Sequence, residues 1–311
     1  METVLLSGGS RPTGCFCGTI GFFDGVHLGH RCLIDQLLQA AADRGEGSMV
    51  ITFERPPRQV VDPDWRPMLL TSLDEKKRLL SAAGVDVLAL LRFDASMAAL
   101  SARDFMCSVL REQLHCRTLL SGYDNRFGRG RAEGFEAYVG YGHELGIEVL
   151  RAEALMLDAE AVSSSRIRRL IGAGEMESAA RCLGRRYELS GRVVHGEQIG
   201  RQLGFPTANI VADDPQKLVP ADGVYAVDVT TSDGCHHAGM MNIGTRPTFD
   251  GEHRTLEVHL LDFAGDLYDQ SLSVAFVSRL REELTFASAD ALRRQMNADA
   301  AVVRKLLFDK I

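Results

Sequence analysis

The 311-residue sequence lacks the short motifs that identify the commonest nucleotide and metal sites. No glycine precedes a lysine, so a G-x-x-x-x-G-K-[ST] phosphate loop is excluded. A G-x-G-x-x-G dinucleotide fingerprint is also missing, because Gly128-Arg129-Gly130 has no third glycine and lies far from the first predicted strand. The seven cysteines form no C-x-x-C pair, and most lie in apolar runs, as reduced core cysteines do. Cys15-x-Cys17 is typical of alternate positions on a strand, although a metal or redox pair is the alternative.

Long apolar runs and excess positive charge are absent as well. No segment approaches the roughly 18 consecutive apolar residues of a membrane span, and the short apolar run at residues 4–6 has no basic leader. The net charge of −7, from 35 basic and 42 acidic residues, argues against a nucleic-acid partner. We therefore expect a cytoplasmic protein with no nucleic-acid or membrane partner.

The order of predicted elements indicates two domains of different class. Strand-like runs at 15–21, 49–53, 86–91, 118–121 and 148–150 alternate with helical patterns at 30–44, 73–83, 102–114 and 133–145. Such alternation predicts an α/β domain with a parallel sheet covered on both faces. The charged run at 74–77 is typical of a solvated helix start. After two short helices at 163–172 and 175–183, six strands are predicted at 187–194, 208–211, 224–231, 238–243, 255–261 and 272–280, followed by a helix at 288–308. This predicts a small antiparallel β-barrel with a C-terminal helix.

Residues 21–30, with the sequence GFFDGVHLGH, join the first long predicted strand to the first long predicted helix. His27 and His30 lie three positions apart where that helix begins, and a helix N-terminus offers unpaired N–H groups and the positive end of its dipole. The neighbouring glycines let a ligand approach the backbone. Two imidazoles there can donate hydrogen bonds to charge that develops on a phosphorus atom. The segment predicts a nucleotide-phosphate site; the alternative is two histidines that only cap or pack.

This segment resembles the signature of the nucleotidylyltransferase superfamily, in the form carried by prokaryotic bifunctional riboflavin kinase/FAD synthetases. TFERPP at 52–57 is similar to a further family segment, although Arg55 stands where the family has its first proline, and SGYDNRFG at 121–128 is similar to another. VSSSRIR at 162–168 is similar to the family's I-S-S-T-x-x-R, with Ser165 in place of threonine. Alone, this last segment would be an ordinary Ser-capped helix. The resemblance implies a Rossmann-like adenylyltransferase domain, which we place at residues 1–180.

The resemblance also implies a reaction and its residues. The FMN phosphate would attack the α-phosphorus of ATP and pyrophosphate would leave, so catalysis would consist of positioning and charge stabilisation. His27 and His30 would hold the α-phosphate oxygens as catalytic residues, and Ser164, Ser165 and Arg168 would hold the β- and γ-phosphates. The implied ATP- and phosphate-binding residues of this domain are Gly21, Phe23, Asp24, Gly29, Ser164, Ser165 and Arg168, and the implied flavin-binding residues are Asn125 and Phe127.

The second domain, which we place at residues 181–311, resembles the riboflavin kinase module. GFPTAN at 204–209 matches that module's G-F-P-T-A-N, and implies ATP binding at Gly204 and Pro206. Thr207 and Asn209 are two positions apart, so on a strand they face the same side. Their hydroxyl and amide oxygens suit Mg²⁺, which also takes water and substrate phosphates. A simple Pro-Thr-Asn turn is the alternative.

The base of the implied kinase reaction lies in EVHLLDF at 257–263, which resembles another segment of the module. By this resemblance, Glu257 takes the proton from the riboflavin 5′-hydroxyl. His259 and His253 could indicate a metal site, but a structural histidine is favoured because no third ligand is evident. REELTF at 281–286 resembles the module's R-x-E-x-x-F, which implies flavin contacts at Arg281 and Glu283.

These observations predict a bifunctional enzyme of flavin cofactor synthesis that uses Mg²⁺. Its kinase domain would convert riboflavin and ATP to FMN, and its first domain would convert FMN and ATP to FAD and pyrophosphate. Two alternatives remain: a chain that retains one activity, and a non-catalytic flavin-binding sensor. A class I aminoacyl-tRNA synthetase, which also has an H-x-G-H-like element, is disfavoured because no K-M-S-K-S-like loop is present.

Overall fold

The computed structural model describes residues 1–6, 9, 11–62, 64–123, 125–196, 200, 204–248 and 251–308, with the backbone alone for 246–248 and 251–253. The chain forms two compact units, Met1–Ser164 and Ser165–Ile311. The boundary predicted between the two functional domains, after residue 180, stays a prediction.

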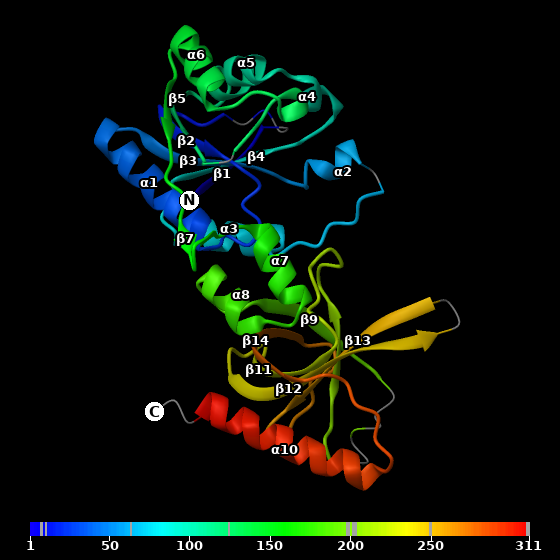
Figure 1. The fold of residues 1–311 in the computed structure, drawn as a ribbon. Helices are drawn as coiled ribbons and strands as arrows, with labels where there is room; N and C mark the ends of the chain where they lie inside the picture. The colour runs from blue at the N-terminus through cyan, green and yellow to red at the C-terminus, as the bar shows by residue number, and fades with distance from the viewer. Residues whose placement is uncertain are drawn as a thin grey trace. The chain divides into compact units, whose positions relative to one another are not determined.

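The first unit contains a six-stranded sheet in which every strand pair is parallel (Figure 1). The strand order is β1-β4-β3-β2-β5-β6. The strands are β1 Glu2–Leu5, β2 Phe16–Ile20, β3 Gly47–Phe53, β4 Val87–Leu91, β5 Cys116–Ser121 and β6 Glu148–Arg151. The predicted parallel α/β architecture is confirmed.

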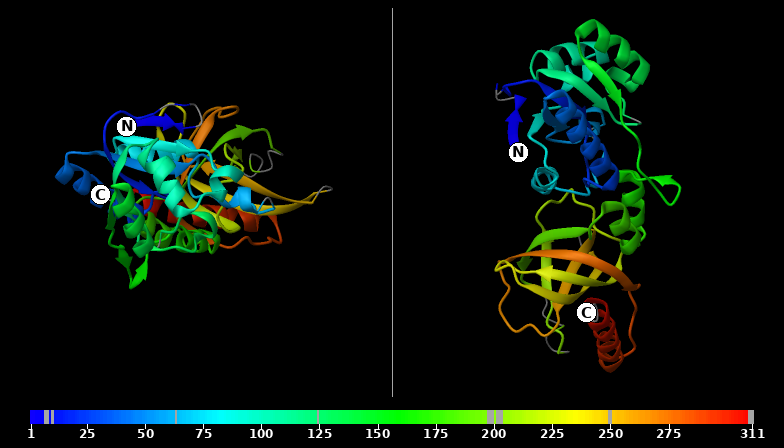
Figure 2. Two further views of the ribbon diagram at one scale, coloured as in Figure 1. Left: turned by 90° about the horizontal axis from the view of Figure 1, so that it is seen from above. Right: turned by 90° about the vertical axis from the view of Figure 1, so that its left-hand side faces the viewer.

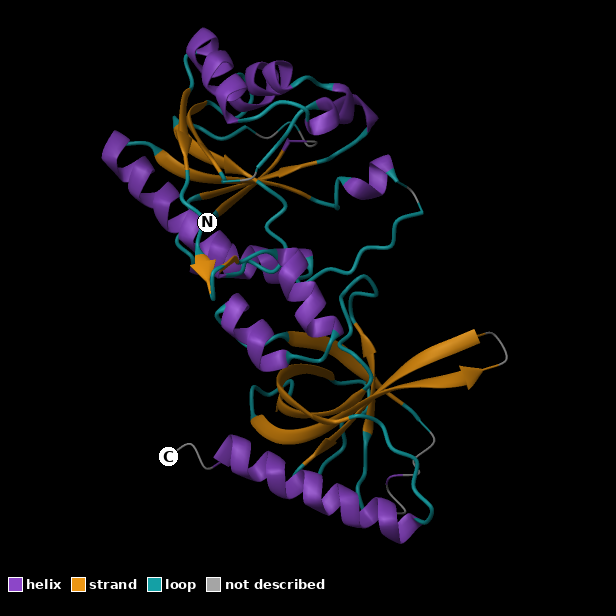
Figure 3. Ribbon diagram, in the orientation of Figure 1, coloured by secondary structure: helices purple, strands orange, loops and turns teal. Residues whose placement is uncertain are grey.

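Helices cover both faces of this sheet (Figure 3). Successive side chains of a strand point to opposite faces, so they pack in two different cores. Met49 and Ile51 of β3 pack in one core, and Val50 packs in the other, against Leu37 and other residues of α1. The helices are α1 Leu28–Arg44, α2 Arg58–Val61, α3 Leu73–Ala82, α4 Ala95–Ala99, α5 Ala102–Phe105 and α6 Phe135–Leu145. Between α5 and α6 lie a π-helix, Met106–Arg111, and a 3₁₀ turn, Arg129–Arg131.

The structure adds elements that the sequence pattern did not predict. Strand β1 pairs with β4 at the sheet edge, and a two-stranded hairpin joins β7 Met156–Leu157 to β8 Glu160–Ala161. The helix predicted at 102–114 continues from α5 as a π-helix, in which Glu112 N–H donates to the Cys107 carbonyl five residues back. Helices α2 and α4 were also unpredicted, because each has five residues or fewer.

The second unit is a closed antiparallel barrel in the order β10-β13-β12-β11-β14-β9. Its strands are β9 Glu188–Val194, β10 Ala208–Ala212, β11 Gly223–Thr230, β12 His236–Thr248, β13 Gly251–Leu260 and β14 Ser271–Arg281. Alternate residues of β14, among them Val274 and Phe276, are fully buried. Helices α7 Ser164–Gly172 and α8 Met176–Leu183 precede the barrel. The predicted barrel is confirmed.

The last helix, α10 Ala289–Phe308, packs on the outside of the barrel (Figure 2, right). Ala300 and Val303 of α10 share a core with Ala226 of β11 and Met240 of β12. This helix therefore covers one wall of the barrel, and its Asp299 is buried there with 5% of its surface exposed.

Candidate active sites

The loop from β2 to α1 has a strained backbone. Phe23 and Val26 have φ angles of 53° and 37°, in the left-handed region that side chains other than glycine rarely adopt. Buried Asp24 stabilises this turn, because its carboxylate accepts the backbone N–H groups of Leu70 (2.9 Å) and Thr71 (3.1 Å). Asp24 therefore organises the loop through its side chain, and a phosphate contact by that carboxylate stays a prediction.

His27 is the N-cap of α1. Its Nδ1 accepts the backbone N–H of His30 at 3.2 Å, and the neutral ring then carries its proton on Nε2. The His27 and His30 rings stack with their centroids 3.7 Å apart. Burial, followed by the effects of His27 and Lys76, lowers the pKa of His30 well below its ordinary value. The His30 ring is therefore neutral, and its Nδ1 atom is buried and without a hydrogen bond among the described residues.

The segment before α7 lies against the start of α1. A Cβ at Gly29 would come within 2.8 Å of the Val162 carbonyl oxygen, so glycine is required for this approach. The Ser164 hydroxyl donates a hydrogen bond of 2.8 Å to the Asp24 carbonyl. The structure thus brings Ser164 to the loop that carries the histidines. Ser165 and Arg168 belong to the second unit, where they lie three residues apart on one face of α7.

Other predicted residues of the first unit have contacts within the fold. A Cβ on Gly21 would lie 3.0 Å from the Phe23 ring. The Asn125 amide donates to the Ile20 carbonyl at 2.6 Å, which holds the loop after β5 against the end of β2. Phe127 is 9% exposed and stacks on Tyr138 with centroids 4.2 Å apart. Its ring packs in a core cluster, so a flavin contact by Phe127 stays a prediction.

Lys76 is a residue of this region that sequence reasoning missed. It was predicted to lie on a solvated helix start, yet only 2% of its surface is exposed. Its Nζ donates to the Phe22 carbonyl at 2.7 Å. The available signal was its spacing from Leu73 and Leu80, which places it on the apolar face of α3.

The barrel contains two cavities that share Thr207. One, of about 350 Å³, is lined by Pro206, Thr207, Asp266 and Tyr268 among others. The other, of about 290 Å³, is lined by Thr207, Glu257, Arg281 and Glu283 together with residues of α10. The structure therefore brings four of the predicted kinase residues to one cavity. Asn242, Phe286 and Asp299 also line it and were not assigned from the sequence.

Glu257 lies beside Thr207, the residue that both cavities share. The Thr207 hydroxyl donates to the Glu257 carboxylate across 3.5 Å, and Asn209 pairs with Glu257 between β10 and β13. His259 Nδ1 donates to the Pro206 carbonyl at 2.7 Å, and its ring contacts Phe205 edge-on. This supports the predicted structural role of His259, because it holds the segment after Gly204. The side chain of His253 lies outside the described residues.

The predicted flavin-binding residues have defined partners. Arg281 Nε donates to the Asp299 carboxylate at 2.9 Å, and Arg281 lies over the Phe286 ring. The Asn242 amide donates to Glu283 at 3.1 Å. A Cβ on Gly244 would lie 2.2 Å from a Glu283 carboxylate oxygen. The Glu283 side chain therefore packs directly against the β12 backbone at this glycine.

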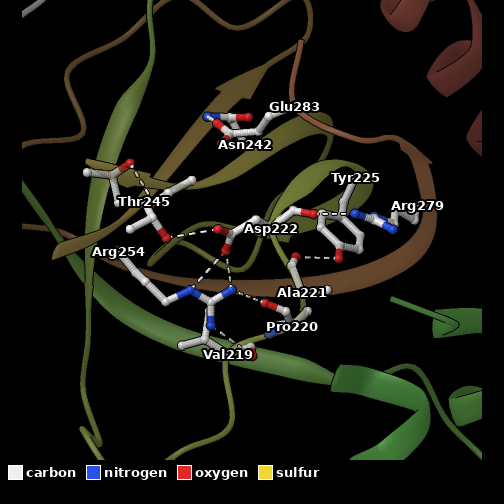
Figure 4. A network of polar contacts seen from close by, with 12 residues as sticks. Val219, Pro220, Ala221, Asp222, Tyr225, Asn242, Thr245, Arg254, Arg279 and Glu283 are labelled. Carbon is white, nitrogen blue, oxygen red and sulfur yellow. Dashed lines mark hydrogen bonds and ion pairs between the residues drawn. The ribbon is translucent and has the colours of Figure 1, made fainter. Parts of the chain in front are cut away.

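A polar network fixes the loop before β11 (Figure 4). The Asp222 carboxylate accepts from Thr245 at 2.8 Å and from Arg254 Nε at 3.0 Å. Burial alone would raise the pKa of Asp222, but the hydrogen bonds from Arg254 and Thr245 lower it below its ordinary value. Arg279 of β14 donates to the Asp222 backbone carbonyl. The network ties three strands to one loop and so holds this part of the barrel in shape.

The described residues contain neither a candidate membrane span nor a candidate metal cluster. No described helix combines the length and apolar character needed to cross a bilayer. Within the same residues, no group of three or more His, Cys, Asp and Glu side chains is arranged to hold a metal ion.

Comparison with known proteins gives a family match for each part of the chain. Residues 11–166 match the FAD synthetase family, and residues 183–307 match the riboflavin kinase family. A bifunctional riboflavin kinase/FMN adenylyltransferase of Pseudomonas fluorescens is 41% identical over 294 residues, covering 94% of this chain and 93% of that protein. The protein of the same name from Escherichia coli K12 is 39% identical over 287 residues, covering 92% and 91%.

A solved structure shows the same fold. It is that of a protein described as a macrolide-efflux protein from Streptococcus pneumoniae, with a TM-score of 0.89 and 31% identity over 98% of this chain and 99% of that one. The resemblance seen in the sequence is confirmed, and the chain belongs to the family of bifunctional riboflavin kinases/FMN adenylyltransferases.

Proposed function

We propose that the two units catalyse consecutive steps of flavin cofactor synthesis. In the barrel, the riboflavin 5′-oxygen attacks the γ-phosphorus of ATP, a new P–O bond forms, and ADP leaves. In the first unit, an oxygen of the FMN phosphate attacks the α-phosphorus of a second ATP, and pyrophosphate leaves with formation of FAD. The proposal is supported by family membership over both units. It is also supported by the contacts of the His27–His30 pair in the first unit and of Glu257 in the barrel.

For adenylyl transfer, the main support is the stacked His27–His30 pair at the N-terminus of α1. Neutral imidazoles donate hydrogen bonds to a phosphate without losing a proton, and the helix N-terminus adds favourable N–H dipoles. We assign the α-phosphate to these two residues. Ser164, Ser165 and Arg168 then hold the β- and γ-phosphates, because hydroxyl and guanidinium groups together bind an anion firmly.

For the kinase step, the main support is Glu257, which lies where the two cavities meet at Thr207. A flavin in the cavity with Arg281 and Glu283 and a nucleotide in the cavity with Pro206 would meet beside this carboxylate. Glu257 then takes the proton of the 5′-hydroxyl as the P–O bond forms. The helix α10 closes the flavin side through Asp299, which also lines that cavity.

We also propose Mg²⁺ at Thr207 and Asn209. Their hydroxyl and amide oxygens are the hard donors that Mg²⁺ accepts. Thr207 lines the proposed nucleotide cavity, and Asn209 pairs with Glu257 between β10 and β13. A bound Mg²⁺ would neutralise phosphate charge. We further propose that the protein works in the cytoplasm as a monomer or weak homo-oligomer on small molecules, without nucleic-acid or membrane partners.

The test is to assay the two reactions separately with the full chain, ATP and Mg²⁺. His30→Ala should abolish FMN→FAD and leave riboflavin→FMN intact, and Glu257→Gln should do the reverse. Each variant is the folding control of the other, because each retains one activity. A wild-type chain that makes only one product supports the single-activity alternative. A chain that binds flavin without turnover supports the sensor alternative.

A further inference from the structure

Lys76 is a charged residue in an apolar position. It lies on α3 between Leu73 and Leu80, which belong to the same core, and 2% of its surface is exposed. Its neighbour Lys77 is partly exposed and pairs with Asp74 at 3.4 Å. The two lysines are adjacent in sequence, but only Lys76 lies inside the fold.

The ammonium group of Lys76 supports the loop that carries the histidines. Its Nζ lies 2.7 Å from the Phe22 carbonyl oxygen and 3.8 Å from the centre of the Phe22 ring. The Thr52 hydroxyl of β3 donates to the same carbonyl at 3.1 Å. Two donors from two elements therefore fix the peptide that precedes Phe23, the first residue of the strained turn.

The charge of Lys76 is not neutralised by an ion pair with any described residue. The carboxylate that acts on it is that of Asp24, which itself accepts the N–H groups of Leu70 and Thr71. Burial lowers the pKa of Lys76 to about 8, and Asp24 only partly opposes this. Burial of an unpaired cation is costly, and such groups gather at functional sites.

The charged and titratable groups that act on His30 are His27 and Lys76. Both lower its pKa further than burial alone, so His30 keeps a neutral ring while Lys76 carries the positive charge. The site thus has a cation beneath the loop and neutral hydrogen-bonding rings at the start of α1.

We propose that Lys76 is a positioning residue for adenylyl transfer: from beneath the strained turn it fixes the Phe22 carbonyl and supplies a buried positive charge to the phosphate site. The inference rests on the proposed adenylyl-transfer function of the first unit. The charge favours the developing negative charge on the α-phosphate, while the hydrogen bond keeps the turn in its strained form. Lys76 acts through the loop and does not itself contact the nucleotide.

The test measures kcat and KM for FMN→FAD between pH 6 and 10 in wild type, Lys76→Met, Lys76→Arg and Lys77→Met. Wild-type kcat should fall as the pH rises through about 8, because Lys76 then loses its proton. Lys76→Met should lower kcat by about tenfold at pH 7 and lack that alkaline fall. Lys76→Arg should restore part of the rate and keep it at pH 9, since arginine stays charged. Lys77→Met should match wild type.

Riboflavin→FMN, measured in the same chains, should be equal in all four and reports an intact barrel, while hydrogen exchange of the parallel-sheet amides reports an intact first unit. The proposal is overturned if Lys76→Met keeps the wild-type kcat. It is also overturned if this variant loses activity but retains the alkaline fall, because the role of Lys76 would then be structural only. If wild type makes no FAD at all, the proposed adenylyl transfer fails, which is a distinct result.

Discussion

The guanidinium of Arg281, in β14, lies 2.9 Å from the carboxylate of Asp299, in α10. Asp299 accepts a second hydrogen bond from Gln295 at 2.8 Å. Because Arg281 and Asp299 both line the smaller cavity, this ion pair links the outer helix to the wall of the proposed flavin site. The helix therefore lines this cavity in addition to covering the barrel.

Removal of Asp299 should impair the kinase step alone. Asp299→Ala leaves Arg281 without its counter-charge, and loss of one partner from a buried ion pair costs about 3–5 kcal/mol. We expect a lower melting temperature of the barrel and a higher KM for riboflavin, with FMN→FAD unchanged. Asp290→Ala is the control, because its pair with Arg293 is exposed. An unchanged riboflavin KM in Asp299→Ala would contradict the link between helix and site.

The two roles of His27 can be separated by substitution. Asparagine is a good N-cap, so His27→Asn should retain the stability of α1 but lose the imidazole. We expect FMN→FAD to fall by about 10²-fold in His27→Asn, as for loss of one transition-state donor. His27→Ala should lose the same activity and about 1 kcal/mol of stability in addition. Equal stability of the two variants, measured by chemical unfolding, would argue against the capping role.

Lys76 should make the stability of the first unit depend on pH. Below pH 8 it is charged in both folded and unfolded states, and the folded state bears the cost of burial. Between about 8, its folded pKa, and 10.5, the unfolded chain binds more protons, so stability should rise with pH by about 1.4 kcal/mol per unit. Lys76→Met should remove this rise.

The same substitution should stabilise the first unit at pH 7. The lost hydrogen bond to Phe22 is worth about 1 kcal/mol, less than the burial cost that is removed, so a gain of about 2 kcal/mol is expected. Hydrogen exchange of amides in the parallel sheet measures both effects. If Lys76→Met is less stable than wild type at pH 7, the ammonium group of Lys76 is better solvated in the folded protein than its burial indicates.

Gly244 offers a way to move Glu283 without altering its chemistry. A Cβ at this position would lie 2.2 Å from the Glu283 carboxylate, which is the mobile end of a long side chain. Gly244→Ala should therefore displace Glu283 while the barrel remains folded. We expect a several-fold higher KM for riboflavin with little change in kcat, and Glu283→Gln should act similarly. If neither variant changes KM, Glu283 does not contact the flavin.

Much of the fold could be predicted because the patterns were long and regular. Continuous apolar strands separated by helices specify a buried parallel sheet, and six short strands with turn residues specify a barrel. Strand β1 was missed because its four residues contain a single buried side chain, Val4. The π-helix was missed because one extra residue per turn leaves the apolar pattern of 102–114 nearly unchanged.

The sites were less accessible to sequence reasoning. His27 and Glu257 could be identified because each lies in a sequence motif, GFFDGVHLGH and EVHLLDF. Motifs did not show that Phe127 stacks on Tyr138, because such packing depends on residues eleven positions apart that meet only in the fold. Lys76 and Asp299 were missed because charged side chains on a helix are usually solvated. For Lys76, the spacing from Leu73 and Leu80 was a signal that went unused, whereas the burial of Asp299 was recognised only in the tertiary structure.

The barrel closes by pairing of its first strand, β9, with its last, β14. During synthesis, β9 leaves the ribosome about 80 residues before the strand that must close on it, whereas the parallel sheet of the first unit is complete before either emerges. Arg281 ends β14, and α10 follows it, so the proposed flavin cavity is assembled last. A nascent chain therefore has its whole parallel sheet before it has a closed barrel, and release of an incomplete chain would remove the first step of the pathway before the second.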